Sequence, residues 1–356
     1  MGSLPAVAAR YASDRTSHRY RAATAGSDLP RAVYYMAALV EPAPTQVLDL
    51  RSIDVEALAP LLAEQIAAWK KDLDWDFTPS ANLVHRFVQM HVLTGYALVL
   101  RGDPTKAIGY SYYVCEDGKG LIGDLYILKQ YRSWEYENAL FQASLDAMWQ
   151  TPGVHRVESQ LLMLSDTPNR RVPYTKWFQA FPRLFLEASS GTRLAPRKLS
   201  SSITVFPWTE PWQEATGRLI AGAYQNHIDS QINDQYRSAV GARRFLTNIV
   251  QYPGCGAFFA PASYAATAQG VLCGVSLASL VSHDVGHITQ VCVAPSFQGT
   301  GLGYELVRRS MESLAAHGCR AVSLTVTAAN ESALRLYRNM GFIEHRAFSA
   351  YVWEPK

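Results

Sequence analysis

The chain has 356 residues, a hydrophobic fraction of 48% and a formal net charge of +3. This length predicts two domains of roughly 150 residues each, and the hydrophobic content excludes general disorder. Basic residues cluster no further than pairs such as Lys70-Lys71, and no apolar run reaches the ~20 residues of a bilayer span, so neither nucleic acid nor a membrane is expected as a partner.

The first half begins with an extension, residues 1–44, that shows no sustained period. Helical spacing of Leu58, Leu61 and Leu62 predicts the first helix, and alternating apolar runs predict strands. In chain order the predicted elements are a strand, two helices, three strands, a helix and a strand: Gln46–Leu50, Ile53–Lys71, Asn82–Val92, Tyr96–Leu100, Ala107–Cys115, Leu121–Leu128, Glu135–Trp149 and Arg156–Met163.

The pattern then breaks down through residues 164–202, where serines and glycines favour a domain boundary. The second half largely repeats the order of elements: Ile203–Phe206, Trp212–Tyr224, Ser238–Val250, Gly256–Ala260, Gly270–Leu280, Gly286–Val293, Gly301–His317, Ala321–Val326, Ser332–Met340, Phe342–Glu344 and Phe348–Trp353. This repetition predicts an internal duplication, with an extension (1–44), a first domain (45–196) and a second domain (197–356).

A glycine-rich turn joins a predicted strand to a predicted helix in the second half. Its sequence is Val293-Ala294-Pro295-Ser296-Phe297-Gln298-Gly299-Thr300-Gly301-Leu302-Gly303. A turn that enters a helix presents free backbone N–H groups and the positive end of the helix dipole to an anion. The glycines remove side chains where a phosphate must approach the backbone, although such turns are also common as plain structure.

A second segment follows about thirty residues later. In Asn330-Glu331-Ser332-Ala333-Leu334-Arg335-Leu336-Tyr337-Arg338-Asn339-Met340-Gly341-Phe342, Asn330 is predicted to cap a short helix that Gly341 ends. Ala333, Leu336 and Tyr337 share one helix face. Alone, Tyr337 reads as a core aromatic residue.

Together the two segments resemble the GNAT superfamily of acetyl-CoA-dependent N-acetyltransferases. Gln298, Gly301 and Gly303 match its phosphate loop, and the second segment matches at these positions: Asn330, Ala333, Leu336, Tyr337, Gly341 and Phe342. The resemblance implies an α/β (α+β) fold of two tandem GNAT-like domains, each a mixed, mostly antiparallel sheet with flanking helices.

The resemblance also implies a site for acetyl-CoA, used as co-substrate without a metal. Backbone groups of Val291, Cys292 and Val293 would pair with the pantetheine arm, and the N–H groups of the loop would hold the pyrophosphate: Gln298, Gly299, Thr300, Gly301, Leu302 and Gly303. Asn330 would contact the carrier and Tyr337 would lie beside the thioester sulfur. Direct attack by a neutral amine needs no nucleophile on the enzyme, so Cys292 is expected to be a core residue.

The amine must lose a proton before it attacks. Many family members carry a glutamate six positions before the valine of the strand end, where this chain has His287. Two interpretations stay open: His287 is the general base, acting through water, or it ends a strand and bonds locally. His283, Asp284 and Glu331 are lesser candidates.

The first half is predicted to be a degenerate copy. Aligning Ile127 with Val293 places Arg132 at the position of Gln298, and Glu135 and Glu137 at the two glycine positions. Two carboxylates there would repel a pyrophosphate and block the backbone. Tandem GNAT proteins with one active half have a similar plan.

The leading functional prediction is an N-acetyltransferase, an acyltransferase that transfers acetyl from acetyl-CoA to a small-molecule amine. The alternatives are a protein N-terminal or lysine acetyltransferase and a non-catalytic acyl-CoA-binding module. The five cysteines are scattered without ligand or disulfide spacing, and no signal-peptide pattern is evident. A cytoplasmic protein, monomer or homodimer, is expected.

Overall fold

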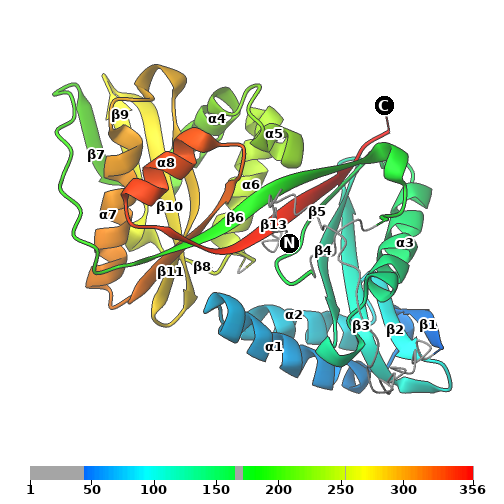
Figure 1. Cartoon of the computed structure of the whole chain (residues 1–356). Helices are drawn as coiled ribbons and strands as arrows, with labels where there is room; N and C mark the ends of the chain where they lie inside the picture. Colours follow the sequence, from blue (N-terminus) through cyan, green and yellow to red (C-terminus); the bar gives the residue numbers. More distant parts are fainter. Residues whose placement is uncertain (1–43, 165–170, 253, 356) are drawn as a thin grey trace, which may run out of the picture.

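A single sheet runs through the whole molecule. The computed structural model describes residues 44–164, 171–252 and 254–355, so the predicted extension lies almost wholly outside the described residues. Within these ranges, strands from both halves join in the order β1-β2-β3-β4-β5-β13-β6-β12-β11-β10-β9-β7, with β8 paired to β10 (Figure 1). The predicted mixed sheet with flanking helices is confirmed.

The strands agree with most predicted positions. First-half strands are β1 (Thr45–Asp49), β2 (Gly95–Leu100), β3 (Asp103–Glu116), β4 (Lys119–Ile127), β5 (Arg156–Gln160) and β6 (Phe178–Ser189). Later strands are β7 (Ile203–Pro207), β8 (Ala257–Phe258), β9 (Tyr264–Ala268), β10 (Val271–Ser282), β11 (Val285–Val293), β12 (Ala321–Thr327) and β13 (Ile343–Trp353). Sequence patterns missed β6 and β9, and they split β13, which is one strand with an irregularity between Glu344 and Arg346.

Two long strands cross between the halves. β6 pairs antiparallel with β12 on one side and with β13 on the other, while β13 pairs with β5. Figure 1 shows this pair running diagonally from one lobe to the other. The last strand of the chain therefore extends the first-half sheet, and a strand from before residue 196 completes the second-half sheet. The domain division at 196/197 stays a prediction, and strand pairing crosses it.

Helices cover both faces of the second-half sheet. The helices are α1 (Ala59–Leu73), α2 (Thr78–Gln89), α3 (Trp134–Gln150), α4 (Gln213–Ala223), α5 (Asp229–Ile232), α6 (Ala239–Gln251), α7 (Leu302–Ala316) and α8 (Glu331–Asn339). In Figure 1, α7 and α8 lie in front of the sheet, with α4 and α6 behind it. Short 3-10 turns join some elements, among them η6 (Asp234–Arg237) and η8 (Pro295–Phe297).

Close packing fixes α7 against the sheet. A Cβ on Gly286 would lie 2.5 Å from Cδ1 of Leu314, and a Cβ on Gly274 would lie 2.9 Å from Cδ1 of Leu306. Real side chains do not approach so closely, so these two glycines let the helix lie directly on β10 and β11. The start of α7 is thereby held rigidly beside the end of β11.

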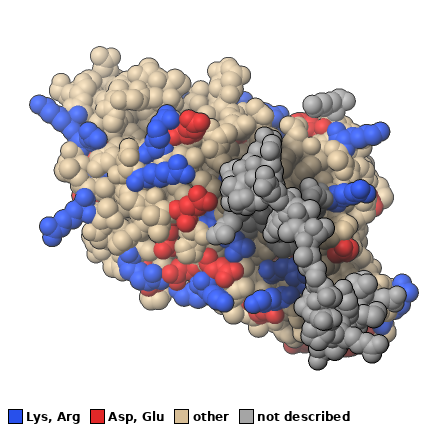
Figure 2. Space-filling view, in the orientation of Figure 1, with Lys and Arg blue, Asp and Glu red and all other residues tan. Residues whose placement is uncertain are grey.

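The surface carries a mixture of charges. On the face shown in Figure 2, basic and acidic side chains are interspersed among uncharged residues. None of the helices in the described part of the chain is both long and apolar enough to cross a membrane.

Candidate functional site

β11 and β12 separate halfway along their length and open a gap in the sheet. They pair in parallel only from Val285–Ala321 to Ile288–Leu324. Directly beyond this point β11 carries a bulge, because Ile288 and Gln290 face neighbouring residues of β10 and leave Thr289 as an extra residue. The bulge bends β11 away from β12, so the two strands separate beyond Ile288.

Two of the three predicted pantetheine-binding residues turn their backbone groups into this gap. Cys292 is paired across the ladder with Val275 of β10, and the N–H of Ala294 donates to the carbonyl of Cys273 on the same side. Backbone groups alternate along a strand, so those of Val291 and Val293 point the other way, toward the gap. The Cys292 side chain is buried in the core, where burial raises the pKa of its thiol well above the usual value.

The glycine-rich loop begins where β11 ends. Gly299 and Gly301 have φ of +77° and +87°, a region that side chains disfavour, so both positions require glycine for the turn itself. Gly301 precedes α7 without any side-chain cap, which leaves the first N–H groups of the helix free to bind an anion. The Leu302 side chain is fully buried, so it can contribute only its backbone.

Gly303 has a different reason to be glycine. Its φ is not positive, and a Cβ there would make only ordinary contacts, 3.6 Å from Val293 and 3.7 Å from Leu336. Neither turn geometry nor protein packing therefore demands a glycine. The space beside it belongs to the cavity, and a side chain would fill part of that space.

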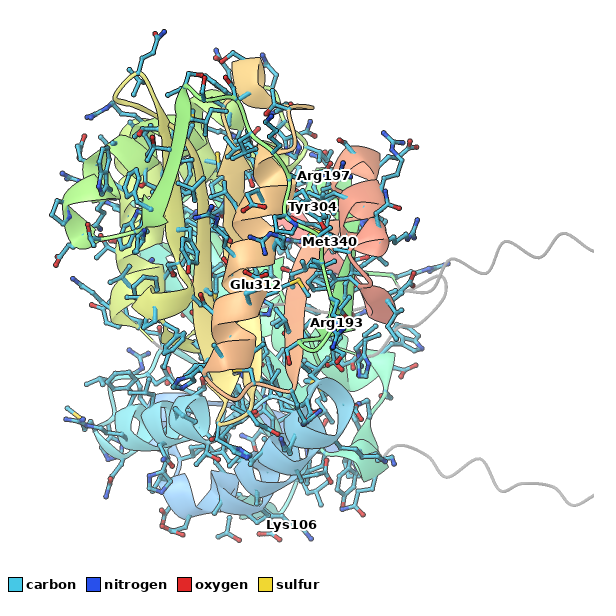
Figure 3. All side chains as sticks on the ribbon, turned by 90° about the vertical axis from the view of Figure 1, so that its left-hand side faces the viewer. Lys106, Arg193, Arg197, Tyr304, Glu312 and Met340 are labelled. Atoms are coloured by element: carbon cyan, nitrogen blue, oxygen red, sulfur yellow. The ribbon has the colours of Figure 1, made fainter. Side chains whose placement is uncertain are left out.

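The connection between β6 and β7 adds positive charge to the same end of the cavity. Arg197 and Lys198 line the cavity. The Arg197 guanidinium carbon lies 5.1 Å from the Tyr304 ring centroid, and the Arg197 N–H donates to Glu305 at 3.2 Å. Figure 3 shows Arg197 beside Tyr304 near the start of α7. Sequence reasoning missed these residues because it treated the segment as a linker.

α8 contributes the predicted Asn330 and Tyr337. Asn330 caps α8, its Oδ1 accepting from the Ala333 N–H at 3.1 Å. Tyr337 lines the cavity, and its hydroxyl has no hydrogen-bond partner among the described residues. Burial, and to a lesser degree the negative charge of Asp229, raises the pKa of Tyr337 above its usual value. The hydroxyl therefore stays protonated and free to donate.

The opposite wall is polar and was not predicted. The segment that follows α4 and includes η6 supplies four residues to the cavity: Tyr224, His227, Asp229 and Tyr236. The Asp229 N–H donates to Nδ1 of His227 at 3.1 Å, and Nδ2 of Asn330 lies 3.3 Å from Nε2 of the same ring. The ring thus faces the cavity close to the start of α8.

Hydrogen bonds link this wall to the exposed edge of β11. The Tyr236 hydroxyl donates to Gln290 at 3.2 Å, Gln290 donates to the Tyr224 hydroxyl at 2.9 Å, and that hydroxyl donates to the Val291 carbonyl at 3.2 Å. The chain orients the carbonyl while leaving the Val291 N–H to the gap. Nε2 of Gln290 also donates to this carbonyl, at 3.3 Å, so both of its lone pairs are used and the N–H is the Val291 backbone group left for a ligand.

His287 lies outside the cavity. It is 3% exposed, its Nδ1 is 2.9 Å from the Ser323 hydroxyl, and its ring packs against Trp75 and Phe185. Burial, with a smaller contribution from the charge of Arg183, lowers the pKa of His287 to about 3. This placement fits the local interpretation of His287 and does not fit a base that meets an amine.

The other candidate bases are also accounted for. His283 is exposed beside Asp284, which bonds Arg320 at 2.7 Å at the far end of the β10–β11 turn. Glu331 begins α8 and pairs with Arg335 at 3.3 Å, and it does not line the cavity. None of the three faces the gap between β11 and β12.

In the first half, the corresponding helix start has no free anion site. Ser133 caps α3, its hydroxyl accepting from the Tyr136 N–H at 3.3 Å, and Glu135 and Glu137 lie in the first turn. The contrast with the uncapped start of α7 supports the prediction of a degenerate copy.

One cavity of about 960 Å³ connects these features. It runs from the loop, Arg197 and Lys198, past Tyr337, to the polar wall. Of the predicted residues it is lined by Val291, Val293, Gln298, Gly299, Thr300, Gly301, Gly303, Asn330 and Tyr337, whereas Cys292, Leu302 and His287 lie behind its surface.

Comparison with known proteins identifies a family that matches the part of the chain around this cavity. Residues 228–342 match the profile of the Acetyltransferase (GNAT) family. The chain is 33% identical over 66 residues to an N-alpha-acetyltransferase of Arabidopsis thaliana, covering 18% of this chain and 35% of that protein. It is 34% identical over 99 residues to a mycothiol acetyltransferase of Thermomonospora curvata, covering 28% and 33% respectively. These matches span only about a third of each relative.

The likeness in structure extends over most of the molecule. A tandem GNAT protein from the clavulanic acid biosynthesis pathway superposes with a TM-score of 0.58 at 12% identity, covering 88% of this chain and 99% of that one. At such low identity the similarity concerns the fold alone. Residues 228–342 therefore belong to the GNAT family of acetyltransferases, within a chain that has the fold of a tandem GNAT protein.

Proposed function

We propose that the protein is an acyltransferase that moves an acetyl group from acetyl-CoA to the amine of a small molecule. The carrying observation is that one cavity joins an uncapped helix start, an exposed strand edge and the unpaired hydroxyl of Tyr337. A carrier with a diphosphate, an amide-containing arm and a thioester needs these three features in this order.

The residues of the site fit such a carrier. The loop N–H groups and the side chains of Arg197 and Lys198 would bind its phosphates, and Gly303 leaves room for them. Backbone groups of Val291 and Val293 would pair with the amides of its arm, as in the addition of a strand to a sheet edge. Asn330 and Tyr337 then lie at the reactive end of the cavity.

Tyr337 would stabilise the departing sulfur. The nitrogen lone pair attacks the thioester carbonyl carbon, the carbon–sulfur bond breaks, and negative charge moves to sulfur. The nitrogen then gives up a proton as the amide forms, and the thiolate takes up a proton from solvent, so the products are the N-acetyl amide and the free thiol of CoA. Because burial keeps the Tyr337 hydroxyl protonated, it can donate a hydrogen bond to that charge throughout the working pH range. Such a bond to a charged acceptor contributes about 1.5–3 kcal/mol.

His227 takes the place that the sequence suggested for His287. It is the histidine in the described part of the chain that lines the cavity, and its ring is oriented by the N–H of Asp229. A neutral imidazole accepts a proton only on the nitrogen that carries no hydrogen, here Nδ1, so His227 would take the proton of the amine there in place of the bond from the Asp229 N–H. We propose this role for His227 and a structural role for His287.

A protein acceptor is the second candidate, because one relative is an N-alpha-acetyltransferase. The small-molecule proposal is favoured by the mixed charge of the acceptor wall, where Arg183 accompanies Asp229, since a cationic peptide terminus calls for an acidic cleft. We also propose a cytoplasmic setting, because all five cysteines are free thiols, as is usual in a reducing compartment.

The test combines calorimetry with acetyl-CoA and thiol release with a panel of amines and peptides. We expect binding, and turnover with small amines that exceeds turnover with peptides. Tyr337→Phe should lower kcat by about 10- to 100-fold, the loss expected for one hydrogen bond to a developing charge, while the Kd for acetyl-CoA changes little. Binding without turnover of any acceptor would point instead to an acyl-CoA-binding module.

A further inference from the structure

Arg183 lies on the acceptor side of the cavity without a counter-ion. It comes from β6, and its side chain lines the cavity. Its guanidinium donates to Oε1 of Gln160 at 2.5 Å and to the Thr325 hydroxyl at 3.4 Å, both neutral partners. The buried Nε has no partner, and among the described residues no carboxylate pairs with the group.

A half-buried guanidinium with a fully buried Nε and no opposite charge is unusual, because burying a charge costs free energy unless an opposite charge compensates. The two fully buried arginines among the described residues do have opposite charges beside them: Arg156 pairs with Glu158 at 2.7 Å and Arg308 with Glu305 at 2.8 Å. The Phe348 ring, 5.6 Å from the Arg183 guanidinium carbon, offers a cation–π contact of only about 0.5–1 kcal/mol. The pairing partner of Arg183 is therefore to be sought in a ligand.

A negative group stands near Arg183 but does not neutralise it. Asp229 accepts a hydrogen bond from the Thr327 hydroxyl, and Thr327 is the cross-strand partner of Arg183 between β12 and β6. Paired residues of antiparallel strands have Cα atoms about 5 Å apart and side chains on one face. A cation and an anion thus stand side by side on one wall, each held by neutral hydroxyl or amide groups.

We propose that the acceptor is an amino acid or a conjugate of one, bound with its carboxylate on Arg183 and its amine toward Asp229 and His227. The planar guanidinium matches the two oxygens of a carboxylate, and Gln160 and Thr325 fix its orientation. Asp229 attracts the amine as its ammonium form, and His227 receives the proton before the attack. This inference rests on the proposed function, whose acceptor class it specifies.

The geometry also gives the first half a part in recognition. Arg183 precedes the predicted boundary at residue 196, and its partner Gln160 ends β5 of the first-half sheet. The half that has lost the phosphate loop therefore supplies and orients the group that reads the acceptor.

The experiment compares acceptors that differ only by the carboxylate. Thiol release from acetyl-CoA is measured with L-lysine against cadaverine, L-ornithine against putrescine, and the other common amino acids against their primary amides. We expect kcat/KM for the preferred acid to exceed that of its counterpart without the carboxylate by about 10- to 100-fold, the effect of one hydrogen-bonded charge pair.

The variants separate recognition from folding. Arg183→Gln should abolish that preference by slowing the acid alone, and Arg183→Lys should retain part of it. Arg197→Gln, which removes an arginine from the carrier end of the same cavity, should raise the KM for acetyl-CoA and leave the preference between acid and amide unchanged. The glutamine side chain introduced by Arg183→Gln can still bond Gln160 and Thr325, so the thermal midpoint should be retained.

The inference would be overturned by turnover restricted to amines without a carboxylate, or by an equal loss for acid and amide in Arg183→Gln. A protein that binds acetyl-CoA but accepts none of the acids would refute it as well. Failure to bind acetyl-CoA at all would instead remove the proposed function, so the two failures are distinguishable.

Discussion

Gly303 offers a direct test of the carrier site, because its neighbours in the protein leave room for a side chain. Gly303→Glu should reduce the affinity for CoA at least 100-fold, since the new carboxylate would enter the phosphate end of the cavity and repel its ligand. Fold stability should not fall, because glutamate is a better helix former than glycine by roughly 0.5–1 kcal/mol. Calorimetry with CoA and thermal unfolding measure the two effects.

The matched control is Gly222→Glu in α4. Gly222 also has open space around its Cβ position, and it does not line the cavity. It should leave CoA affinity unchanged. Unaltered affinity in Gly303→Glu would show that the phosphates lie elsewhere.

For His287 we predict an effect of pH on the stability of the fold and not on catalysis. Its pKa is about 3 in the folded protein and 6.5 in the unfolded chain, so only the unfolded state binds a proton between these values. Stability is therefore complete above pH 6.5 and falls as the pH drops toward 3. Between about pH 7.5 and 5 this one group should cost about 2 kcal/mol.

Urea unfolding of His287→Gln at about pH 7.5 and 5 tests the prediction. Glutamine can bond Ser323 but does not titrate, so the variant should lose about 2 kcal/mol less than the parent over that interval. In the pH–rate profile of His287→Gln, the fall in rate at low pH that reports protonation of the general base should remain. If that fall disappeared, His287 would be the base after all.

The same residue shows where sequence reasoning ends. Counting back from Val293 located a strand position correctly, but on a buried strand neighbouring positions face different surroundings. Trp75 and Phe185, both distant in sequence, close over the ring of His287. His227, in contrast, follows α4 in a segment without periodicity, and only the folded chain brings it to Asn330. The residues of the glycine-rich loop are contiguous and can be predicted from a local pattern. The residues on the acceptor side come together only through tertiary contacts, so the sequence does not identify them.

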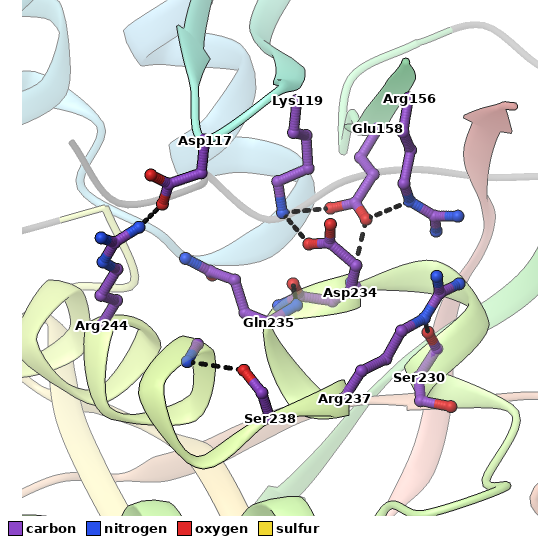
Figure 4. Close-up of polar contacts among 12 residues, drawn as sticks. Asp117, Lys119, Arg156, Glu158, Ser230, Asp234, Gln235, Arg237, Ser238 and Arg244 are labelled. Carbon is purple, nitrogen blue, oxygen red and sulfur yellow. Dashed lines mark hydrogen bonds and ion pairs between the residues drawn. The ribbon is translucent and has the colours of Figure 1, made fainter. Parts of the chain in front are cut away.

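At the scale of elements, a buried charge network docks α5 and η6 onto the first-half sheet. Glu158 is 3% exposed and accepts from Lys119 at 3.0 Å, Arg156 at 2.7 Å and the Asp234 N–H at 2.9 Å (Figure 4). Lys119 also pairs with Asp234, and Arg156 bonds the carbonyl of Gln231. The segment held in this way carries Asp229 and Tyr236 of the acceptor wall.

Glu158→Gln should loosen that segment. Removing the charge of Glu158 leaves Lys119 with Asp234 and Arg156 with Glu354 as ion partners, and both of these carboxylates are partly exposed. The loss of the buried carboxylate should therefore destabilise the protein by about 3 kcal/mol. Hydrogen exchange of residues 229–237 should quicken, and acceptor KM should rise while the Kd for acetyl-CoA is unchanged. Asp117→Asn is the control, because the Asp117–Arg244 pair joins the first-half sheet to the neighbouring helix α6 at an exposed position and is worth little. Equal effects of both variants would contradict the positioning role.

The elements themselves were predictable to the extent that their patterns are local. The helices and most strands follow apolar periods, whereas β6 was missed because Pro182 argues against a central strand. The carbonyl of Pro182 accepts from the Ala328 N–H, so its backbone faces the β12 side, one residue beyond the last β6–β12 pair, Arg183–Thr327. Pro182 has no N–H to return to the Ala328 carbonyl, and its place at the end of the β6–β12 ladder limits the loss to this one bond. No local signal reports where a neighbouring strand ends.

For the whole molecule, the exchanged strands predict that the halves do not fold independently when cut at the suspected boundary. A fragment of residues 197–356 lacks β6, the strand that lies between β12 and β13. β12 would lose seven residue pairs, from Ala321–Ser189 to Thr327–Arg183, and β13 would lose all its pairs with β6. Unpaired strand edges with apolar side chains invite aggregation. The apolar side chains of Leu184 and Leu186, which pack in the second-half core, would be missing as well.

A fragment of residues 171–356 keeps β6 and is the matched comparison. We expect the shorter fragment to be insoluble or to lack a cooperative thermal transition, and the longer one to unfold cooperatively and to bind CoA, because it retains the loop, Arg197 and the β11 edge. Circular dichroism and calorimetry with CoA measure these outcomes. If residues 197–356 alone folded and bound CoA as tightly as the intact chain, β6 would be dispensable. The continuous sheet would then be a docking of two autonomous domains and not a shared core.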